Sequence, residues 1–300
     1  MLYRNNLYLS VVTRRAASCY TVTRHGAKGL FKLMEVYVEP KRYHRECGHW
    51  WFDCWDWAVN TALSWACRPR IAVRPGEVAI DPHIHTLFSH CSISQPKKII
   101  LRAVRLGLGG VAIMDHSDIR GARDAAWCAA DLKAAGAVPE DFLVIPGVEV
   151  NSASGHIGAL FVDEILPDAL SVEETVRVIH EAGGLAVAVH PYHAAGIGGA
   201  VFDAPFDAVE VECGSVFSLA KARKNQSLAQ DLRLSGMTKL GSSDAHYAGA
   251  VGSCYSVING IQQPTLQAAR EAIANGRCAA RSSEPWSRLR SFLSLMPIAK

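Results

Sequence analysis

The segment Asp81-Pro82-His83-Ile84-His85-Thr86 decides how the rest of the chain is interpreted. The residues before it, 77–80, are apolar enough to form a buried strand. Side chains at positions i and i+2 of a strand point the same way, so His83 and His85 should project together from its C-terminal end. Neutral imidazole is a preferred ligand of zinc, iron and related ions. The segment therefore indicates a metal site, with two ordinary polar residues as the alternative.

Downstream segments repeat this arrangement. Several apolar runs that read as strands end in, or run directly into, a side chain that can bind a metal; these side chains are His116, Glu149, His190, Asp244 and His246. We expect alternating strands and helices from residue 77 onward, which favours a parallel sheet covered by helices. About seven such units favour a closed barrel over an open sheet. Barrels of this kind gather their chemistry at the C-terminal ends of the strands, where these side chains would meet.

The expected helices and strands follow from local patterns. Pro96 to Leu106 has a 3.6-residue apolar period and a proline suited to the first turn. A further helix begins near Ser171, and Glu174 completes a capping box there. The other expected helices cover 121–134, 219–235 and 265–275, and the expected strands cover 77–80, 110–114, 142–150, 156–162, 185–189, 206–211, 238–240 and 255–258.

Composition fits a soluble globular protein. The 300 residues are 49% hydrophobic and 20% charged, which provides for a sizeable core. The net charge of +3 is too small to indicate a general polyanion binder, and it is uneven: residues 1–76 have a balance of +7, and residues 77–300 one of −4. A mildly acidic region suits a site that holds cations. The nine cysteines are scattered and include no Cys-x-x-Cys pair, which indicates reduced thiols in a cytoplasmic protein.

The first quarter of the chain differs from the rest. Residues 1–34 contain no acid, as in a transit peptide, but lack a clear amphipathic repeat. Residues 50–67 contain five of the seven tryptophans, and Asp53 and Asp56 interrupt the run. The run is therefore too short and too charged to span a bilayer, so we expect an amphipathic helix that contacts the core, a partner or a membrane surface. A zinc site is a weaker alternative, with ligands His44, Cys47, His49 and Cys54.

Pro69 and the pair Pro75-Gly76 mark a boundary. We expect an N-terminal extension at 1–75, much of it with little structure, a catalytic domain at 76–282 and a C-terminal tail at 283–300.

Ordered motifs then give the chain a family resemblance, which runs from about Ile80 to Arg281. They are Asp81-x-His83-x-His85-Thr86, Ile113-Met114-Asp115-His116, Pro146-Gly147-Val148-Glu149, Gly155-His156, Val189-His190-Pro191, Asp207-Ala208-Val209-Glu210 and Gly241-Ser242-Ser243-Asp244-Ala245-His246. In this order they resemble the polymerase and histidinol phosphatase (PHP) family of metal-dependent phosphoesterases. The resemblance implies an α/β fold, a distorted (β/α)7 barrel, preceded here by the N-terminal extension.

The resemblance also implies a site for two or three divalent metals, Mn, Fe or Zn. The first metal would be held by His83, His85, Glu149 and Asp244. Glu149 would bridge to a second metal, which His156 and His190 complete. The third would be held by His90, His116 and His246; many members have Asp at the position of His90, where His keeps a ligand.

The implied activity is hydrolysis of a phosphate ester by a hydroxide that bridges the metals. The substrate would be a small phosphorylated metabolite, a nucleotide or an oligonucleotide end, and no stable duplex binding is expected. Besides Glu149, the candidate catalytic residues are Asp244 and His246 for proton transfer, His193 as a donor or acid, and Arg120 as a phosphate clamp. The alternatives are a metal-dependent C–N hydrolase and a non-catalytic metal-binding module.

Four acidic residues near the expected ligands are assigned no metal. Asp81 and Asp115 each precede a ligand, and we expect them to orient imidazoles by accepting hydrogen bonds. Glu210 and Glu212 share one face of a strand, where one of them could line the pocket.

Overall fold

The computed structural model describes residues 20–24, 31–35, 50–261 and 263–296. Two compact units divide the chain, residues 1–48 and residues 49–300. In the first unit the described residues form two antiparallel strands, β1 (Tyr20–Arg24) and β2 (Phe31–Glu35). The His44, Cys47 and His49 ligands of the alternative zinc site lie outside the described residues.

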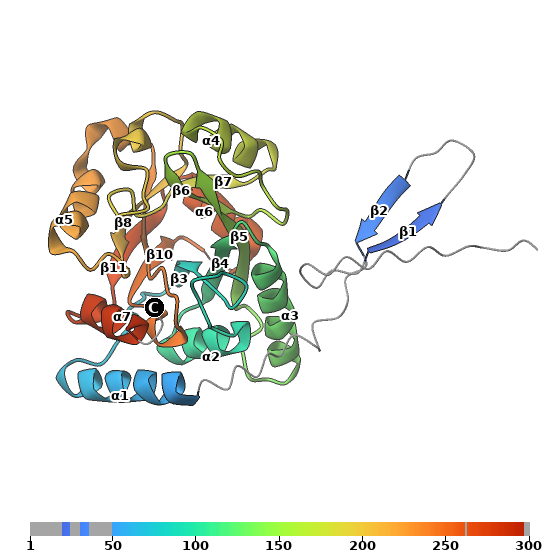
Figure 1. The fold of residues 1–300 in the computed structure, drawn as a ribbon. Helices are drawn as coiled ribbons and strands as arrows, with labels where there is room; N and C mark the ends of the chain where they lie inside the picture. The colour runs from blue at the N-terminus through green and yellow to red at the C-terminus, as the bar shows by residue number, and fades with distance from the viewer. Residues whose placement is uncertain (1–19, 25–30, 36–49, 262, 297–300) are drawn as a thin grey trace, which may run out of the picture. The chain divides into compact units, whose positions relative to one another are not determined.

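The second unit is built on a nine-stranded sheet (Figure 1), in the order β11-β10-β3-β4-β5-β6-β7-β8-β9. Its strands are β3 (Glu77–Ile84), β4 (Gly110–His116), β5 (Leu143–Ser152), β6 (Gly155–Leu160), β7 (Leu185–Ala188), β8 (Ala208–Cys213), β9 (Thr238–Ser242), β10 (Cys254–Asn259) and β11 (Cys278–Ser282). Every strand expected from residue 77 onward is present, and β11 is additional.

The sheet is mixed, so the expectation of a wholly parallel sheet is wrong. β6 runs antiparallel to both β5 and β7, and β10 runs antiparallel to β3 and β11. The physical reason at β6 is the short connection from β5: Ser152 pairs with Gly155, so only two residues turn the chain. A turn of that length can join only antiparallel neighbours. His156, near the start of β6, therefore lies at the same rim as the C-terminal ends of the parallel strands.

The two edges of the sheet approach each other, which makes the sheet a nearly closed barrel. Ser256 on β10 accepts a hydrogen bond from the backbone N–H of Gly241 on β9 (3.0 Å) and donates one to its carbonyl (2.8 Å). A Cβ at Gly241 would lie 2.5 Å from the carbonyl oxygen of Tyr255, so only glycine allows this approach. The expected α/β barrel is thus confirmed.

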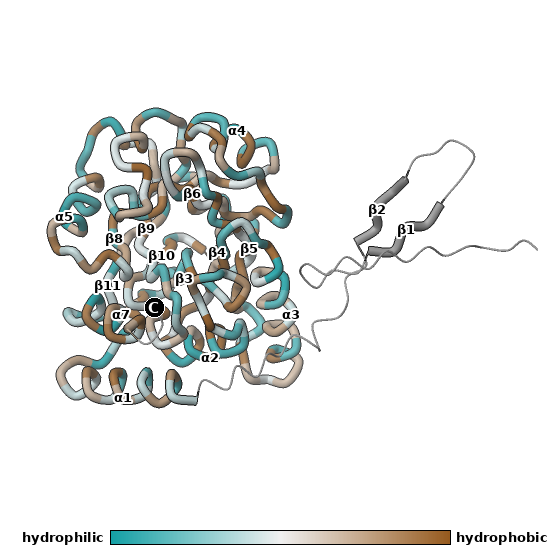
Figure 2. Tube along the Cα trace, viewed as in Figure 1, coloured by the Kyte–Doolittle hydropathy of each residue, from teal (hydrophilic) through white to brown (hydrophobic). Residues whose placement is uncertain are grey.

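Helices cover the outside of the sheet (Figure 1). They are α2 (Pro96–Leu106), α3 (Arg120–Ala134), α4 (Val172–Glu181) and α5 (Leu219–Ser227), whereas α6 (Leu266–Ala274) packs at one end of the barrel against its interior core. The predicted bounds of α2 and the capping box between Ser171 and Glu174 are confirmed. Apolar residues line the inner side of these helices and the strands, whereas α5 is largely hydrophilic (Figure 2).

The Trp-rich segment forms α1 (Trp50–Ala66), which packs beside α7 (Ser287–Leu295) at one side of the barrel. The indole N–H of Trp55 donates a hydrogen bond to the carbonyl of Leu293 (2.8 Å). Arg290 is buried and forms an ion pair with Glu284, and it also donates to the Oδ1 of Asn60 (2.8 Å). The compact unit therefore includes helices on both sides of the predicted limits at 76 and 282.

The outer face of α1, defined here by Trp50, Trp57 and Trp65, is unusually apolar for an exposed surface. These three side chains are 72%, 69% and 87% exposed, and the seven- and eight-residue steps between them place them on one side of the helix. Phe52 and Val59 are buried on the opposite side. No helix in the described part of the chain is long and apolar enough to cross a membrane.

Candidate metal centre

His83 and His85 lie at the C-terminal end of β3 and are completely buried. The Nδ1 of His83 is 3.0 Å from Oε1 of Glu210 on β8, an interaction that fixes the ring and leaves Nε2 directed into the barrel. That Nε2 is 3.2 Å from the Nε2 of His85. Two imidazole nitrogens at this separation can share at most one proton, so a cation is the alternative that satisfies both lone pairs.

Glu149 is the carboxylate at the centre of the cluster. It lies on β5 and is completely buried. Its Oε1 is 3.0 Å from His156 Nδ1 and 3.2 Å from His190 Nε2. Its Oε2 is 3.1 Å from His116 Nδ1 and 3.3 Å from His85 Nε2. The Nε2 of His83 lies 3.6 Å from the same Oε2, so five imidazoles surround this one carboxylate.

Asp244 supplies a second carboxylate, directly after β9. Its Oδ1 is 3.0 Å from His85 Nε2 and 3.5 Å from His83 Nε2, and its Oδ2 accepts a hydrogen bond from Ser215. The backbone of Asp244 has a φ of +48°, a left-handed conformation that is uncommon outside glycine. His190, after β7, has a φ of +28°. Such strained residues gather at functional sites, where the surrounding structure holds them.

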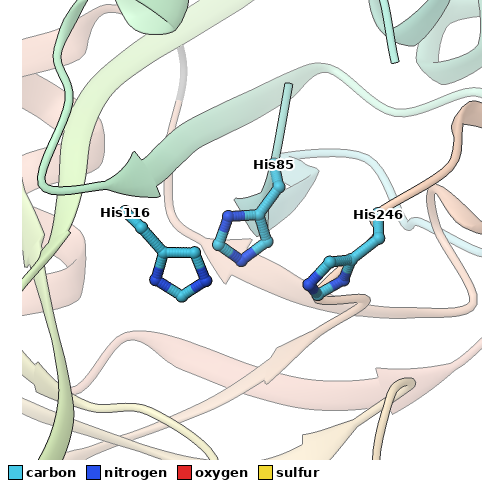
Figure 3. A group of neighbouring side chains, drawn as sticks. All are labelled: His85, His116 and His246. Atoms are coloured by element: carbon cyan, nitrogen blue, oxygen red, sulfur yellow. The ribbon is translucent and has the colours of Figure 1, made fainter. Parts of the chain in front are cut away.

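The imidazoles form one continuous cluster at the rim. Neighbouring ring centroids are 4.5 to 5.7 Å apart, and the members are His83, His85, His90, His116, His156, His190, His193 and His246. Figure 3 shows three of them, His85, His116 and His246, which converge from separate segments of the chain. Eight of the twelve histidines thus meet at one place, although they are spread over more than 160 residues of sequence.

Five sets of three side chains have ligand atoms within 4.8 Å of one another: His83/His85/Glu149, His83/His190/Asp244, His116/Glu149/His156, His85/His116/His246 and His90/Cys91/His116. The first two sets include all four residues expected for the first metal. Both partners of Glu149 expected for the second metal lie against its Oε1. The residues expected for the third metal divide between two sets, because His116 lies with His246 in one and with His90 in the other.

The charges of the cluster favour cations. Burial opposes protonation of His83, but the carboxylates of Asp244, Glu210 and Glu149 raise its pKa well above the usual value. Burial likewise disfavours ionised Glu149 and Asp244, yet the neighbouring imidazoles, His83 foremost, hold the pKa of both carboxyls well below the usual value. Burial and the charge on His246 lower the pKa of His85 to about 3. Protons thus supply part of the positive charge that the carboxylates require.

Unpartnered atoms show that the donor set fits divalent ions. Among the described residues, Glu149 Oε2, His116 Nδ1 and His190 Nδ1 are buried without a hydrogen-bond partner. Leaving such an atom unpaired costs about 1–3 kcal/mol each. Two of them, Glu149 Oε2 and His116 Nδ1, are only 3.1 Å apart. An ion coordinated by both would remove both penalties, and a set of imidazoles with carboxylates suits Zn, Fe or Mn.

Glu210 is the positioning residue that the sequence did not assign. It faces His83 Nδ1 and also accepts a hydrogen bond from the backbone N–H of His190 (2.9 Å), so it holds two of the candidate ligands. The motif Asp207-Ala208-Val209-Glu210 predicted that Glu210 lies on a strand beside the site. It did not predict that Glu210 contacts His83. Glu212, by contrast, pairs with Arg288 (2.6 Å), away from the imidazoles.

Asp81 and Asp115 act differently from our expectation. Asp81 accepts hydrogen bonds from the backbone N–H groups of Ser243 (2.9 Å) and Gly252 (2.8 Å), and so it anchors the loop that carries Asp244. Asp115 accepts from the backbone N–H of Thr86 (2.6 Å) and from the Ser89 hydroxyl (2.7 Å). Within the described ranges, neither carboxylate forms a direct hydrogen bond to an imidazole, but Asp115 reaches His85 through the Ser89 hydroxyl, which lies 3.2 Å from His85 Nδ1.

The remaining two candidates lie at the edge of the cluster. The His193 ring is 5.1 Å from that of His190, and burial lowers the pKa of His193 to about 4, which favours a neutral ring. Arg120 forms an ion pair with Asp118 (2.5 Å) and lies over the Phe88 ring. Arg120 is therefore engaged by an acid two residues away instead of pointing freely at the imidazoles.

Fold and site together define a barrel-like α/β protein with a buried cluster of potential metal ligands. Residues 223–278 match the family described as PHP-associated. The chain is 35% identical over 143 residues to an uncharacterized protein of Methanocaldococcus jannaschii, MJ1587; the match covers 44% of this chain and 79% of that protein. The chain belongs to the PHP family.

A solved structure with this architecture supports the fold. PsfC from Pseudomonas syringae superposes with a TM-score of 0.55 at 19% identity, covering 74% of this chain and 98% of PsfC. An amidohydrolase from Chromobacterium violaceum, solved with bound sulfate and no metal, gives a TM-score of 0.47 at 20% identity and covers 69% of this chain and 98% of that one. At these identities the likeness concerns the fold alone.

Proposed function

We propose that this protein is a metal-dependent phosphoesterase. The observation that carries the proposal is the position of Glu149, whose Oε1 faces two imidazoles and whose Oε2 faces three without a hydrogen-bond partner among the described residues. When bound there, divalent ions would acidify a water molecule and neutralise phosphate charge. The residues that would hold them are those of the predicted sets: His83, His85, His90, His116, Glu149, His156, His190, Asp244 and His246.

Exposure of the ligands gives the direction of substrate approach. His83, His85 and Glu149 are buried, whereas His156 and His246 are partly exposed and His90 is exposed. A substrate would therefore approach the rim from the side of the exposed imidazoles. We propose a small phosphorylated metabolite, a nucleotide or an oligonucleotide end, since a terminal phosphate can reach this rim without a duplex entering the barrel.

Residues of the chain would also bind the substrate and move protons. The Nδ1 of His246 is 2.9 Å from the carbonyl oxygen of Asp244, so a proton on Nδ1 leaves Nε2 as the acceptor at the rim. His193, held neutral beside His190, would accept or donate a hydrogen bond to a phosphate oxygen. Arg120 would clamp the phosphate only by giving up part of its pairing with Asp118.

The decisive experiment combines elemental analysis with a substrate panel. We expect two or three Mn, Fe or Zn ions per chain, together with hydrolysis of phosphomonoesters, nucleoside bisphosphates or short oligonucleotides. A panel of amides and cyclic amides tests the alternative, a metal-dependent C–N hydrolase. Bound metal with neither activity would indicate a non-catalytic metal-binding module, and a metal-free protein would overturn the proposal.

Glu149→Gln tests the bridging carboxylate directly. The variant keeps the size of the side chain but removes the negative charge that would hold the cations. Loss of a group that only hydrogen-bonds a metal ligand costs up to about 100-fold, so loss of a ligand itself should lower turnover by more than about 100-fold. Circular dichroism should remain that of the wild type. Glu173→Gln, an exposed change on α4, is the matched control. Full activity in Glu149→Gln would remove the bridging role.

We also propose that the outer face of α1 contacts a membrane surface. Tryptophan favours the membrane–water interface, because the indole is apolar but carries one N–H donor. Beyond the helix, Arg68, Arg70 and Arg74 are exposed, and a cationic segment next to an apolar helix face is complementary to anionic lipid.

Sedimentation with vesicles tests this contact. Wild-type protein should bind phosphatidylserine-containing vesicles more tightly than neutral ones, and replacement of Trp50, Trp57 and Trp65 by Ser should abolish the difference. Trp127→Ser on α3 is the control for loss of an indole elsewhere. Binding that is equal in the wild type and the triple variant would contradict the proposal, and dimerisation lost in the triple variant would instead indicate a second copy.

The described cysteines, all free thiols, suit a reducing compartment. We propose a cytoplasmic location, which is compatible with a peripheral membrane contact. Cell fractionation tests this proposal.

A further inference from the structure

The loop after β3 presents two adjacent side chains, His90 and Cys91, to the rim. Buried serines fix the loop on both sides of this pair. Ser89 donates its hydroxyl to Asp115 (2.7 Å) and accepts from the backbone N–H of His116 (3.0 Å). Ser92 donates its hydroxyl to the carbonyl of His246 (2.8 Å). Fixed ends on both sides hold His90 and Cys91 against the imidazole cluster.

Cys91 lies within coordination range of two imidazoles. One ligand atom each of His90, Cys91 and His116 lies within 4.8 Å of the other two. The His90 and His116 rings are stacked, with centroids 5.0 Å apart. The His116 side chain is only 9% exposed, and its Nδ1 faces Glu149 Oε2 at 3.1 Å, so Nε2 is the nitrogen that would serve this outer set. The set therefore combines a thiol on a fixed loop with two stacked imidazoles.

No other described cysteine shares this placement. Cys213 is also buried near the site, but its sulfur lies 3.3 Å from the Ser215 hydroxyl, and it belongs to none of the ligand sets of the described chain. Cys54 is exposed on α1 and Cys128 is half-buried on α3.

We propose that Cys91, together with His90 and His116, binds the outermost cation of the centre and makes that position selective for a thiophilic ion. One sulfur and two imidazole nitrogens suit Zn²⁺, Fe²⁺ or Co²⁺, whereas Mg²⁺ and Mn²⁺ prefer oxygen ligands. On binding, the thiol releases its proton to solvent, and the thiolate and two neutral imidazoles each donate one electron pair. Cys91 would take the place that the resemblance gives to His246, which lies with His85 and His116 in a separate set. The inference rests on the proposed metal centre, but it does not depend on which bond that centre hydrolyses.

Cobalt substitution tests the sulfur ligand without measuring activity. Protein stripped of metal and reloaded with Co²⁺ should show an intense near-ultraviolet thiolate-to-cobalt charge-transfer band. Cys91→Ser should lose this band and about one bound ion per chain, whereas Cys128→Ser should keep both. His90→Gln should weaken binding of the same ion. A band that persists in Cys91→Ser would overturn the proposal.

Alkylation of the wild-type protein provides a second test that needs no variant to fold. Zn²⁺ should slow the reaction of Cys91 with iodoacetamide at least about tenfold, as read by peptide mass spectrometry, and leave the exposed Cys54 unchanged. Equal labelling of Cys91 with and without Zn²⁺, in protein that elemental analysis shows to be fully loaded, would also overturn it. A protein with the cobalt band but no phosphoesterase activity would refute the proposed function and leave this ligand assignment intact.

Discussion

The rim of the barrel and the outer face of α1 depart from ordinary solvation in opposite ways. The rim buries carboxylates and imidazoles: Asp81, His83 and Glu149 are inaccessible to solvent. The outer face of α1 exposes Trp50, Trp57 and Trp65. Proteins normally keep ionisable groups in water and large apolar groups out of it. Each region is therefore incomplete as an isolated surface, one lacking positive charge and the other lacking an apolar cover.

The comparison teaches how differently the two regions are held in place. Candidate ligands are fixed by bonds that involve no cation, such as those from Glu210 to His83 and from Asp81 to the backbone N–H of Ser243. The positions of the three indoles on the outer face, by contrast, are fixed only by the placement of α1. The rim should thus keep its shape without its ions, whereas α1 requires its contacts with α7.

Removal of the metals should have the largest effect. Dialysis against a chelator should lower phosphoesterase activity by more than about 100-fold, because the carboxylates would again be balanced only by protons. The far-ultraviolet circular dichroism should not change, since the ligands are held by the framework of the barrel. Activity should return with Mn, Fe or Zn. Unfolding on chelation would break the comparison, because the rim would then depend on its ions as α1 depends on α7.

Glu210→Gln should have the next largest effect. The amide cannot match the carboxylate that fixes His83 Nδ1 and the His190 N–H, so metal affinity should fall by about 10- to 100-fold. Isothermal titration with Zn²⁺ measures this fall independently of turnover. Glu212→Gln is the matched control on the same strand, since Glu212 pairs with Arg288 and not with a histidine. Equal affinities in the two variants would show that Glu210 has no positioning role.

The smallest effect concerns Asp56 on the inner side of α1. Burial raises its pKa to about 6 from 3.8, so the folded protein binds this proton more tightly than the unfolded chain does. The resulting stabilisation is complete below about pH 4 and is lost as the pH rises through about 6. Asp56→Asn should therefore raise stability at pH 7.5 by on the order of 1 kcal/mol, allowing for partial exposure of the side chain.

Thermal melts between pH 4 and pH 8 measure this difference. The gain from Asp56→Asn should shrink toward pH 4, where the carboxyl of the folded wild type is protonated and buries no charge. Asp141→Asn, in an exposed loop, should follow the wild type at every pH. A gain independent of pH would exclude the titration of Asp56 as its cause.

Local patterns in the sequence were sufficient for most helices and for the convergence of the ligands, although the helix expected over 219–235 ends at Ser227. Pro96 and the apolar period gave the bounds of α2, and Ser171 with Glu174 gave the start of α4. The alternation of His83 and His85 placed both on one side of β3. These features depend on neighbours within a few residues, where spacing alone determines geometry.

Contacts between distant segments were not predictable in the same way. Glu210 lies 127 residues from His83, and nothing local marks it as a partner. The reversed direction of β10 and the burial of Arg290 beside Asn60 likewise depend on how the barrel closes. The apolar character of α1 was evident in the sequence. Which side of the helix is buried depends on its packing against α7, and the sequence did not predict that contact.

The link between Arg290 and Asn60 spans 230 residues and has a consequence for synthesis on the ribosome. α1 is made before the barrel, but its hydrogen bonds to α7 can form only after residue 293 has left the exit tunnel. During almost the whole of translation the nascent chain would therefore display both the outer and the inner side of this tryptophan-rich helix.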